Sequence, residues 1–305
     1  MCQEAHSTLG VWPISFSYPR HTILATEEQG ATICPVFPGH RYRFSQEDDY
    51  LDFYRSYAFA LTHKKAGWDC FRHLEILYTG STPFMPDATL IPRFTMVHYP
   101  KQFFAEVAGQ LIRSSGYLDM GARQNLNEYF NRHLTSDAMA RYLLRAAAVP
   151  SDAKILFVDS AAPHAPDYQS ILTLIGLKQF LGKRVHVANP IGYLYSDWTG
   201  ESDSLYGRGF GYSGVLEPIW KNDNEIIGEP LNLNRSFLAQ FGVVIVGSVT
   251  RNPGSVEKLR QLYPAEKTIY IHGEDEGPSR SEMRNFVSSG AKLFVRELSD
   301  DLSSS

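Results

Sequence analysis

The sequence predicts an α/β protein in which short parallel strands alternate with helices. Two observations lead to this class. Apolar runs in the second half are continuous and separated by helical segments, as expected for strands buried on both faces of a parallel sheet. The 305 residues are 43% hydrophobic, so the chain can bury a large core and has the length of two domains.

The second half, residues 149–305, is expected to form a Rossmann-like domain. Its predicted strands lie at 154–160, 184–190, 241–248, 268–275 and 292–298. A helix is expected to start with Pro166 at its first position and to end at Gly182, because proline suits the first turn and glycine the end of a helix. Two later helices are expected over 254–263 and 279–289.

The first half, residues 1–148, is less regular but has elements of the same kind. Ser45, followed by an acid three residues later, indicates a capping box at a helix start, and an apolar run follows at 57–62. The other expected elements are a helix ending near Thr79, strands at 81–85 and 95–99, a helix from Pro100 and two helices within 120–148. We place the domain boundary within 146–153, where a proline and small residues follow a helix.

Composition limits the functional classes. The net charge is −4 and no long basic stripe is present, which argues against nucleic acid as a partner. Cys2, Cys34 and Cys70 fit neither a disulfide framework nor a four-ligand zinc site. No apolar run reaches the roughly 20 residues that span a bilayer, and the first residues do not resemble a signal peptide. We therefore expect a cytoplasmic protein without a transmembrane segment.

The loops after the predicted strands are expected to line a cleft between the two domains. In open parallel sheets, ligands bind beyond the carboxyl ends of the strands. The loops at these ends are 62–69, 159–167, 246–253 and 272–279.

The stretch HKKAGWDCFRHLEILYTGSTPFMPD, residues 63–87, has the features of an anion site. If Asp69 caps the following helix, the free N–H groups of that helix and a nearby Lys64, Lys65 or Arg72 suit a diphosphate. A carboxylate such as Glu75 suits the two hydroxyls of a ribose. The plainer alternative is a solvated lysine pair and an ordinary surface ion pair between the arginine and the glutamate.

The same stretch resembles the nucleotide-sugar-binding motif of GT-B glycosyltransferases, in particular the exostosin-like and the viral or bacterial polysaccharide enzymes. The matching residues are Lys65, Gly67, Trp68, Asp69, Cys70, Arg72, His73, Glu75, Gly80 and Pro83. The resemblance implies that the glutamate holds the donor ribose and that basic residues neighbour the diphosphate. The implied donor-binding residues are Lys64, Lys65, Gly67, Trp68, Arg72, His73 and Glu75.

Four segments of the second half resemble the acceptor-side domain of the same family. They are 167–195, 205–214, 269–276 and 293–298. In that family the acceptor domain comes first, whereas here the order is reversed. The segments 10–20 and 292–298 look like two sides of one interdomain junction, so we expect a circular permutation.

The resemblance implies transfer of a sugar from a nucleotide-sugar donor to a glycan acceptor, with inversion and with no metal or other cofactor required. The expected general base follows a strand of the acceptor domain, and the candidates are Asp167, His164 and Asp275. Asp167 is favoured by its DYQS setting. Its alternative role is to sit in the first turn of a helix, and Asp275 could instead order the hinge with Arg296.

The acceptor is expected to contact Tyr206, Arg208, Phe210 and Arg251. The first three lie in or beside GFGYSG, residues 209–214, which matches G-x-G-x-x-G. No apolar strand leads into this motif, so a dinucleotide oxidoreductase is a weaker alternative. Arg251 could equally be a solvated side chain.

Two further alternatives remain open. A metal-dependent GT-A transferase would need an acidic motif after a strand, and GEDE at 273–276 lacks a D-x-D. A catalytically silent GT-B fold could bind glycan or act as a scaffold. In either GT-B case the chain could be one module of a larger polysaccharide-synthesis protein.

Overall fold

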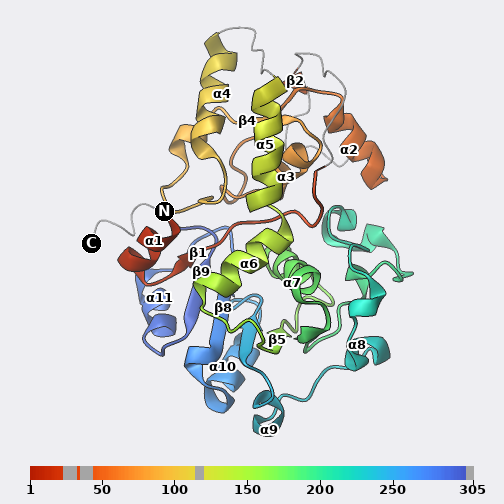
Figure 1. Ribbon diagram of the computed structural model, residues 1–305, viewed down its shortest axis with the longest axis vertical. Coiled ribbons are helices and arrows are strands. Elements are labelled where there is room, and N and C mark those ends of the chain that lie inside the picture. The colour runs from red at the N-terminus through yellow and green to blue at the C-terminus, as the bar shows by residue number, and fades with distance from the viewer. Residues whose placement is uncertain (23–32, 35–43, 114–119, 300–305) are drawn as a thin grey trace.

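A computed structural model describes residues 1–22, 33–34, 44–113 and 120–299 of the chain. It confirms the α/β class, because a six-stranded and a three-stranded sheet are both parallel and both covered by helices (Figure 1). None of the helices in these ranges combines the length and the apolar composition needed to cross a membrane.

The larger sheet has the strand order β1-β9-β8-β7-β5-β6. Its strands are β1 (Trp12–Pro13), β5 (Ile155–Val158), β6 (Val185–Val187), β7 (Val243–Val246), β8 (Thr268–His272) and β9 (Lys292–Val295). From β5 the chain goes first to β6 on one side and then to β7 on the other. The loops after β5 and β7 therefore flank a switch point, where open α/β sheets bind ligands.

Helices cover both faces of this sheet. α6 (Ser136–Ala146) and α7 (Tyr168–Leu181) pack against Ile155, Phe157 and Ile245 on one face. Leu156 and Val244 point to the other face, toward three helices. These are α1 (Cys2–Leu9), α10 (Pro253–Leu262) and α11 (Arg280–Val287). Because neighbouring strand residues point to opposite faces and both faces are covered, the strands read as continuous apolar runs.

The smaller sheet has the order β2-β3-β4. Its strands are β2 (Ile33–Cys34), β3 (Phe59–Leu61) and β4 (Thr82–Phe84). Its helices are α2 (Glu47–Arg55), α3 (Phe71–Tyr78), α4 (Lys101–Arg113) and α5 (Met120–His133). Tyr50 and Ile76 cover one face with Ala60, while Val107 covers the other with Phe59.

Most predicted elements are confirmed, and three local predictions are wrong. Residues 95–99 form no strand, because the Thr95 hydroxyl bonds the main chain of Leu298 and Met96 takes a left-handed φ of 51°. The helix α7 begins after Asp167, not at Pro166, since the aspartate side chain accepts the N–H of its first turn. The helix α2 has Gln46 at its N-cap and no side-chain cap from Ser45.

The first strand of the chain belongs to the sheet of the second half. β1 pairs with β9 in parallel, and the N–H of Ile14 donates to Val295 O at 2.9 Å. The two ends of the described chain also meet the same loop, because Glu4 pairs with Arg93 and Leu298 bonds Thr95. The larger sheet thus contains strands from both sides of the predicted domain boundary at 148/149. That boundary stays a prediction.

A segment between Pro218 and Ile227 is fixed to the larger sheet by a buried ion pair. It contains the short α8 (Asp223–Ile227) and is followed by α9 (Arg235–Leu238). Lys178 of α7 donates to Glu225 Oε2 at 2.6 Å and to Trp220 O at 2.8 Å. With both charges satisfied, this network specifies the position of the segment.

Candidate functional site

A cleft of about 720 Å³ lies between the carboxyl ends of the larger sheet and the start of α3. Both sheets contribute to its walls, and all four loops predicted to meet there supply residues. The predicted site residues that line it are Lys65, Gly67, Arg72, Glu75, Asp167, Tyr206, Arg208, Arg251 and Asp275. Other lining residues are Phe16, Asp69, Cys70, Phe71, Tyr168, Glu274 and Arg296.

Five predicted site residues lie elsewhere. Lys64 Nζ lies over the ring of Trp68 at 5.3 Å, and that ring packs against the main core. His73 is fully buried between Thr62 and the carbonyl of Trp68, and burial lowers its pKa to about 4. Phe210 is buried in the core of the smaller sheet.

The fifth, His164, lies on an exposed turn after β5, where its N–H donates to Ala161 O. It does not reach the cleft, although Asp167 three residues later does. The structure therefore separates the two candidate bases that share this loop.

The start of α3 opens on the cleft without a side-chain cap. Its N-cap is Cys70, which makes no capping bond, so the expectation that Asp69 caps the helix is wrong. The carboxylate of Asp69 instead accepts the N–H of Phe16 at 2.7 Å and the hydroxyl of Tyr99 at 2.9 Å. The amino end of α3 keeps its positive potential, which suits an anion.

Two cations lie beside this helix end, Lys65 and Arg72. Among the described residues, neither Lys65 nor Arg72 forms an ion pair. Nε and one terminal nitrogen of Arg72 are also buried, with no hydrogen-bond acceptor among the described residues. A buried guanidinium without acceptors costs free energy, so the arrangement suits an anionic ligand.

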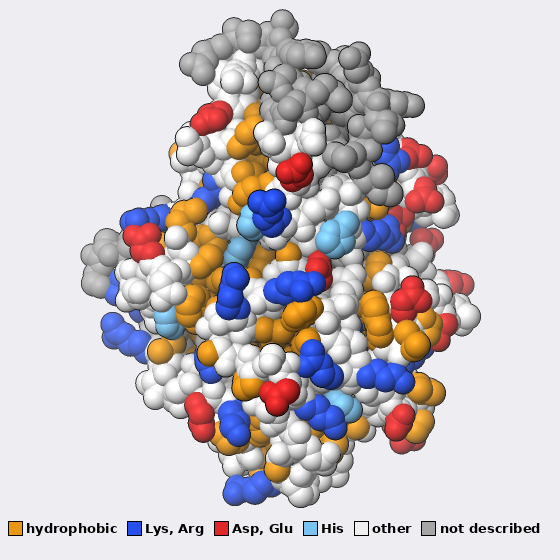
Figure 2. Space-filling model, viewed as in Figure 1, with side chains coloured by type: hydrophobic (Ala, Val, Ile, Leu, Met, Phe, Trp, Pro, Cys, Tyr) orange, Lys and Arg blue, Asp and Glu red, His pale blue; other side chains and the backbone are white. Residues whose placement is uncertain are grey.

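One surface arginine, Arg141, has partners within the protein. Figure 2 shows Lys and Arg side chains over the face that carries α6. On that helix Arg141 pairs with Asp137 at 3.2 Å and lies 4.1 Å from the ring centre of Phe180. Arg141 therefore has both a charge partner and a ring contact within the protein.

Glu75 lies one turn further along α3 and is held from behind. It is 4% exposed, and the hydroxyl of Tyr50 donates to its Oε2 at 2.7 Å. Burial raises its pKa to about 7, while the Tyr50 bond and the charges of Arg72 and Lys65 lower it and Glu47 raises it. The plainer alternative, a surface ion pair with Arg72, is not formed, so Glu75 remains available to donors in the cleft.

Asp167 stands on the opposite wall at the N-cap of α7. Its Oδ1 accepts the N–H of Ser170 at 2.8 Å. Burial raises its pKa to about 6, partly offset by this bond and by the charge of Arg251. The Arg251 guanidinium is itself fixed by a bond to Ala165 O at 2.5 Å. A carboxylate with a pKa near neutrality has the properties of a general base.

The rim of this wall is formed by Tyr206 and Arg208. Tyr206 is 60% exposed and packs edge-on against Tyr168, with ring centres 5.5 Å apart. Arg208 pairs with Asp203 at 2.8 Å and has a left-handed φ of 59°. An exposed aromatic ring on a shaped loop suits a sugar ring.

The residue that joins the two walls, Arg296, appeared in the sequence reasoning only as a possible partner of Asp275. It is 1% exposed and donates to Asp275 Oδ1 at 2.5 Å, to Asp69 O at 2.5 Å and to Gly273 O at 2.8 Å. Glu297 beside it accepts the N–H of Asp69 at 2.8 Å. Arg296 and Glu297 directly follow the buried strand β9, and this charged pair is the feature of the sequence that could have indicated their role.

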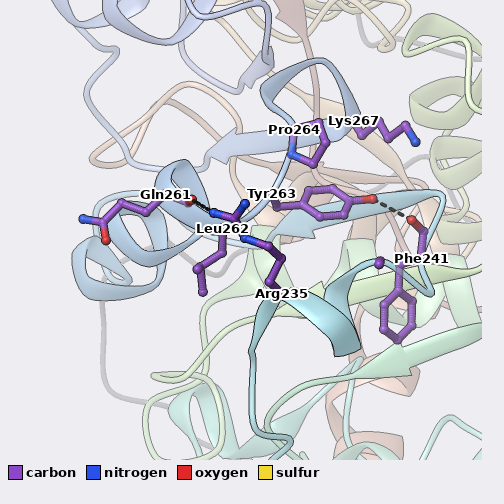
Figure 3. Close-up of a pocket in the computed structure, with 8 residues that line it drawn as sticks. Arg235, Phe241, Gln261, Leu262, Tyr263, Pro264 and Lys267 are labelled. Carbon is purple, nitrogen blue, oxygen red and sulfur yellow. Dashed lines mark hydrogen bonds between the residues drawn. The ribbon is translucent and has the colours of Figure 1, made fainter.

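A second hollow, of about 430 Å³, lies at the other end of the larger sheet (Figure 3). Its polar side chains already bond the protein, because Arg235 donates to Gln261 O and Tyr263 to Phe241 O. It is at the amino end of β7 and β8, where such sheets do not bind substrates.

In the described parts of the chain, no group of three His, Cys, Asp or Glu side chains is placed to hold a metal. No protein-family model, curated protein or solved structure matches this chain.

The first prediction concerns the pH dependence that Glu75 gives to stability. Its pKa rises from 4.5 to about 7 on folding, so its contribution is complete below pH 4.5 and is lost as the pH rises through 7. Glu75→Gln keeps an acceptor for Tyr50 but cannot ionise. The variant should match the wild type near pH 4 and exceed its free energy of unfolding by about 3 kcal/mol near pH 8.

Urea denaturation across this range measures the difference. Glu201→Gln, an exposed glutamate outside the cleft, is the control and should follow the wild type at every pH. Parallel pH profiles for Glu75→Gln and the wild type would contradict the buried, strained state of this carboxyl group.

Proposed function

We propose that this chain is a glycosyltransferase that takes a sugar from a nucleotide-sugar donor. The observation that carries the proposal is the start of α3, where a helix end without a side-chain cap, Lys65 and Arg72 offer positive charge that no carboxylate of the described residues pairs. Glu75 one turn away offers a buried acceptor. This combination matches a diphosphate followed by a ribose.

Transfer would proceed by direct displacement. The acceptor hydroxyl attacks the anomeric carbon and gives its proton to Asp167, while the bond from that carbon to the diphosphate oxygen breaks. The departing nucleoside diphosphate keeps the electron pair, and Lys65, Arg72 and the α3 N–H groups stabilise its charge. Side-chain cations supply this stabilisation, so no metal or cofactor is part of the proposal.

The overall arrangement supports a GT-B architecture in permuted order. Two Rossmann-like units face the same cleft, and β1 of the first half completes the sheet of the second. Glu4 and Leu298, from opposite ends of the described chain, contact the same loop at Arg93 and Thr95. Such contacts are expected if, in the unpermuted order, the chain ran continuously through this region and had its ends between residues 148 and 149.

One observation favours the alternative of a silent glycan-binding fold. An oxygen of Asp167 is occupied by the N–H of Ser170, the role of an ordinary helix cap. Turnover decides between the two functions, since binding of a nucleoside diphosphate is expected from both.

The donor site is tested by nucleotide affinity. Thermal shifts with UDP, GDP, CMP and dTDP select the nucleotide, and calorimetry then measures its affinity. Lys65→Gln and Arg72→Gln should each weaken binding about 10- to 100-fold through lost charge-assisted bonds. Lys64→Gln is the matched control and should bind normally, because Lys64 is adjacent in sequence but packs on Trp68 outside the cleft. Equal losses of nucleotide affinity in Lys64→Gln and Lys65→Gln would contradict the proposed donor site.

The base is tested by turnover of the matching donor. Asp167→Asn keeps the N-cap bond to Ser170 but cannot take a proton, so turnover should fall roughly 100-fold or more with nucleotide affinity unchanged. His164→Gln, in the same loop but outside the cleft, should turn over normally. Normal turnover by the aspartate variant would move the base elsewhere, and absence of turnover in the wild type would favour the silent fold.

The permutation is tested by restoring the other order. A chain opened between Ala148 and Val149, with Ser305 joined to Met1 by a short glycine-serine linker, should fold and bind the same nucleotide with the same affinity. Circular dichroism and calorimetry measure both properties. Failure of this chain to fold would refute the inference that the present ends mark an original junction.

A further inference from the structure

The loop Leu205–Gly214, here named the cleft strap, connects the two units of the protein. It is anchored in the larger unit by Tyr212, whose buried ring packs edge-on against that of Tyr168 in α7, with ring centres 5.6 Å apart. At its middle, Phe210 is 5% exposed and lies among side chains of the smaller unit. These side chains are Cys34, Tyr50, Leu51, Tyr54, Ala60 and Ile76.

The backbone conformation of the strap places the Phe210 ring in the smaller unit. Four residues within 207–211 have left-handed φ angles, and three of them are glycines, which adopt this region without strain: Gly207 (58°), Gly209 (73°) and Gly211 (79°). The fourth is Arg208 (59°). Gly211 is also required by space, because a Cβ there would lie 2.7 Å from ring carbons of Phe71. The expectation that Phe210 stacks on an acceptor sugar is therefore wrong, since its ring is inserted into the opposite unit.

Phe210 packs on the residue that holds Glu75. Its ring centre lies 5.8 Å from that of Tyr50, with 31° between the planes. The hydroxyl of the same Tyr50 donates to Glu75 Oε2 at 2.7 Å. A second tie runs beside it, because Gly211 N–H donates to Glu47 Oε1 at 3.0 Å. The strap thus contacts the Glu75 carboxylate through one intermediate side chain, that of Tyr50.

We propose that Phe210 is a positioning residue that acts through Tyr50 to orient Glu75, so that the cleft strap couples the two walls of the cleft. Tyr206 and Arg208 on the strap line the wall opposite α3. A ligand that orders these residues also orders Phe210, and with it the grip of Glu75 on a donor. The role given to Glu75 rests on the proposed function, whereas the chain of contacts does not.

The contact chain is tested without any ligand, by following the Glu75 carboxyl carbon during a pH titration in ¹³C-glutamate-labelled protein. Tyr50→Phe should raise the pKa, because the lost hydrogen bond favours the ionised form. Phe210→Leu should raise it in the same direction by a smaller amount. The double variant should titrate like Tyr50→Phe alone, since residues that act in series are not additive.

Phe53→Leu is the matched control, because Phe53 belongs to the same cluster but its ring contacts Tyr54 and Tyr57. It should leave the Glu75 titration unchanged. An unchanged titration in Phe210→Leu, a shift of equal size in the control, or additive shifts in the double variant would overturn the proposal.

The nucleotide gives an independent readout. Phe210→Leu should lower the affinity for the nucleotide selected by thermal shift about 3- to 10-fold. It should cause no further loss of affinity when Tyr50→Phe is already present. If the wild type binds none of these nucleotides, the proposed function fails, and the titration alone still decides whether Phe210 positions Glu75.

Discussion

The buried guanidinium of Arg296 is the constraint on which the cleft depends. A charge with 1% exposure is tolerated only when it is paired and fully hydrogen-bonded, and here its partners come from both units. Bonds to Gly273 O and Asp275 fix it to the larger sheet, and its bond to Asp69 O fixes the loop that leads into α3. Gly67 completes this fit, because a Cβ there would lie 2.6 Å from Glu297 Oε1. The amino end of α3 is therefore set against the carboxyl ends of the larger sheet by hydrogen bonds between buried charged groups and the main chain of Asp69.

The cleft opposes this stabilisation with groups that lack partners. Arg72 has buried donors with no acceptor among the described residues, and burial raises the pKa of Glu75 to about 7 and that of Asp167 to about 6. Each of these states costs free energy and is relieved by a ligand of opposite charge or by a transferred proton. Surface charges such as Arg141 have no such strain. Strain of this kind, concentrated between two rigid sheets, is what distinguishes a binding site from a merely polar hollow.

The sequence predicted the layers of the fold better than the details of the site. The strands were predictable because burial on both faces leaves continuous apolar runs, and the loops after them were placed in the cleft by the rule for parallel sheets. The strand predicted at 95–99 failed because Thr95 bonds Leu298, a contact that local pattern does not encode. The role of Asp69 failed for the same reason, since it bonds Phe16 and Tyr99 and leaves the helix uncapped. Local propensity cannot anticipate partners that lie far along the chain.

These long-range contacts also set the geometry of the site. The bonds that build the cleft join residues that only the folded state brings together, as Asp69 with Glu297 and Gly211 with Glu47. None of these bonds depends on whether the covalent chain passes through 148 and 149 or through the present ends, because loop connectivity affects mainly the entropy of closing each loop. The paired guanidinium that sets the walls and the strap that links them are therefore held by contacts that only the folded state makes.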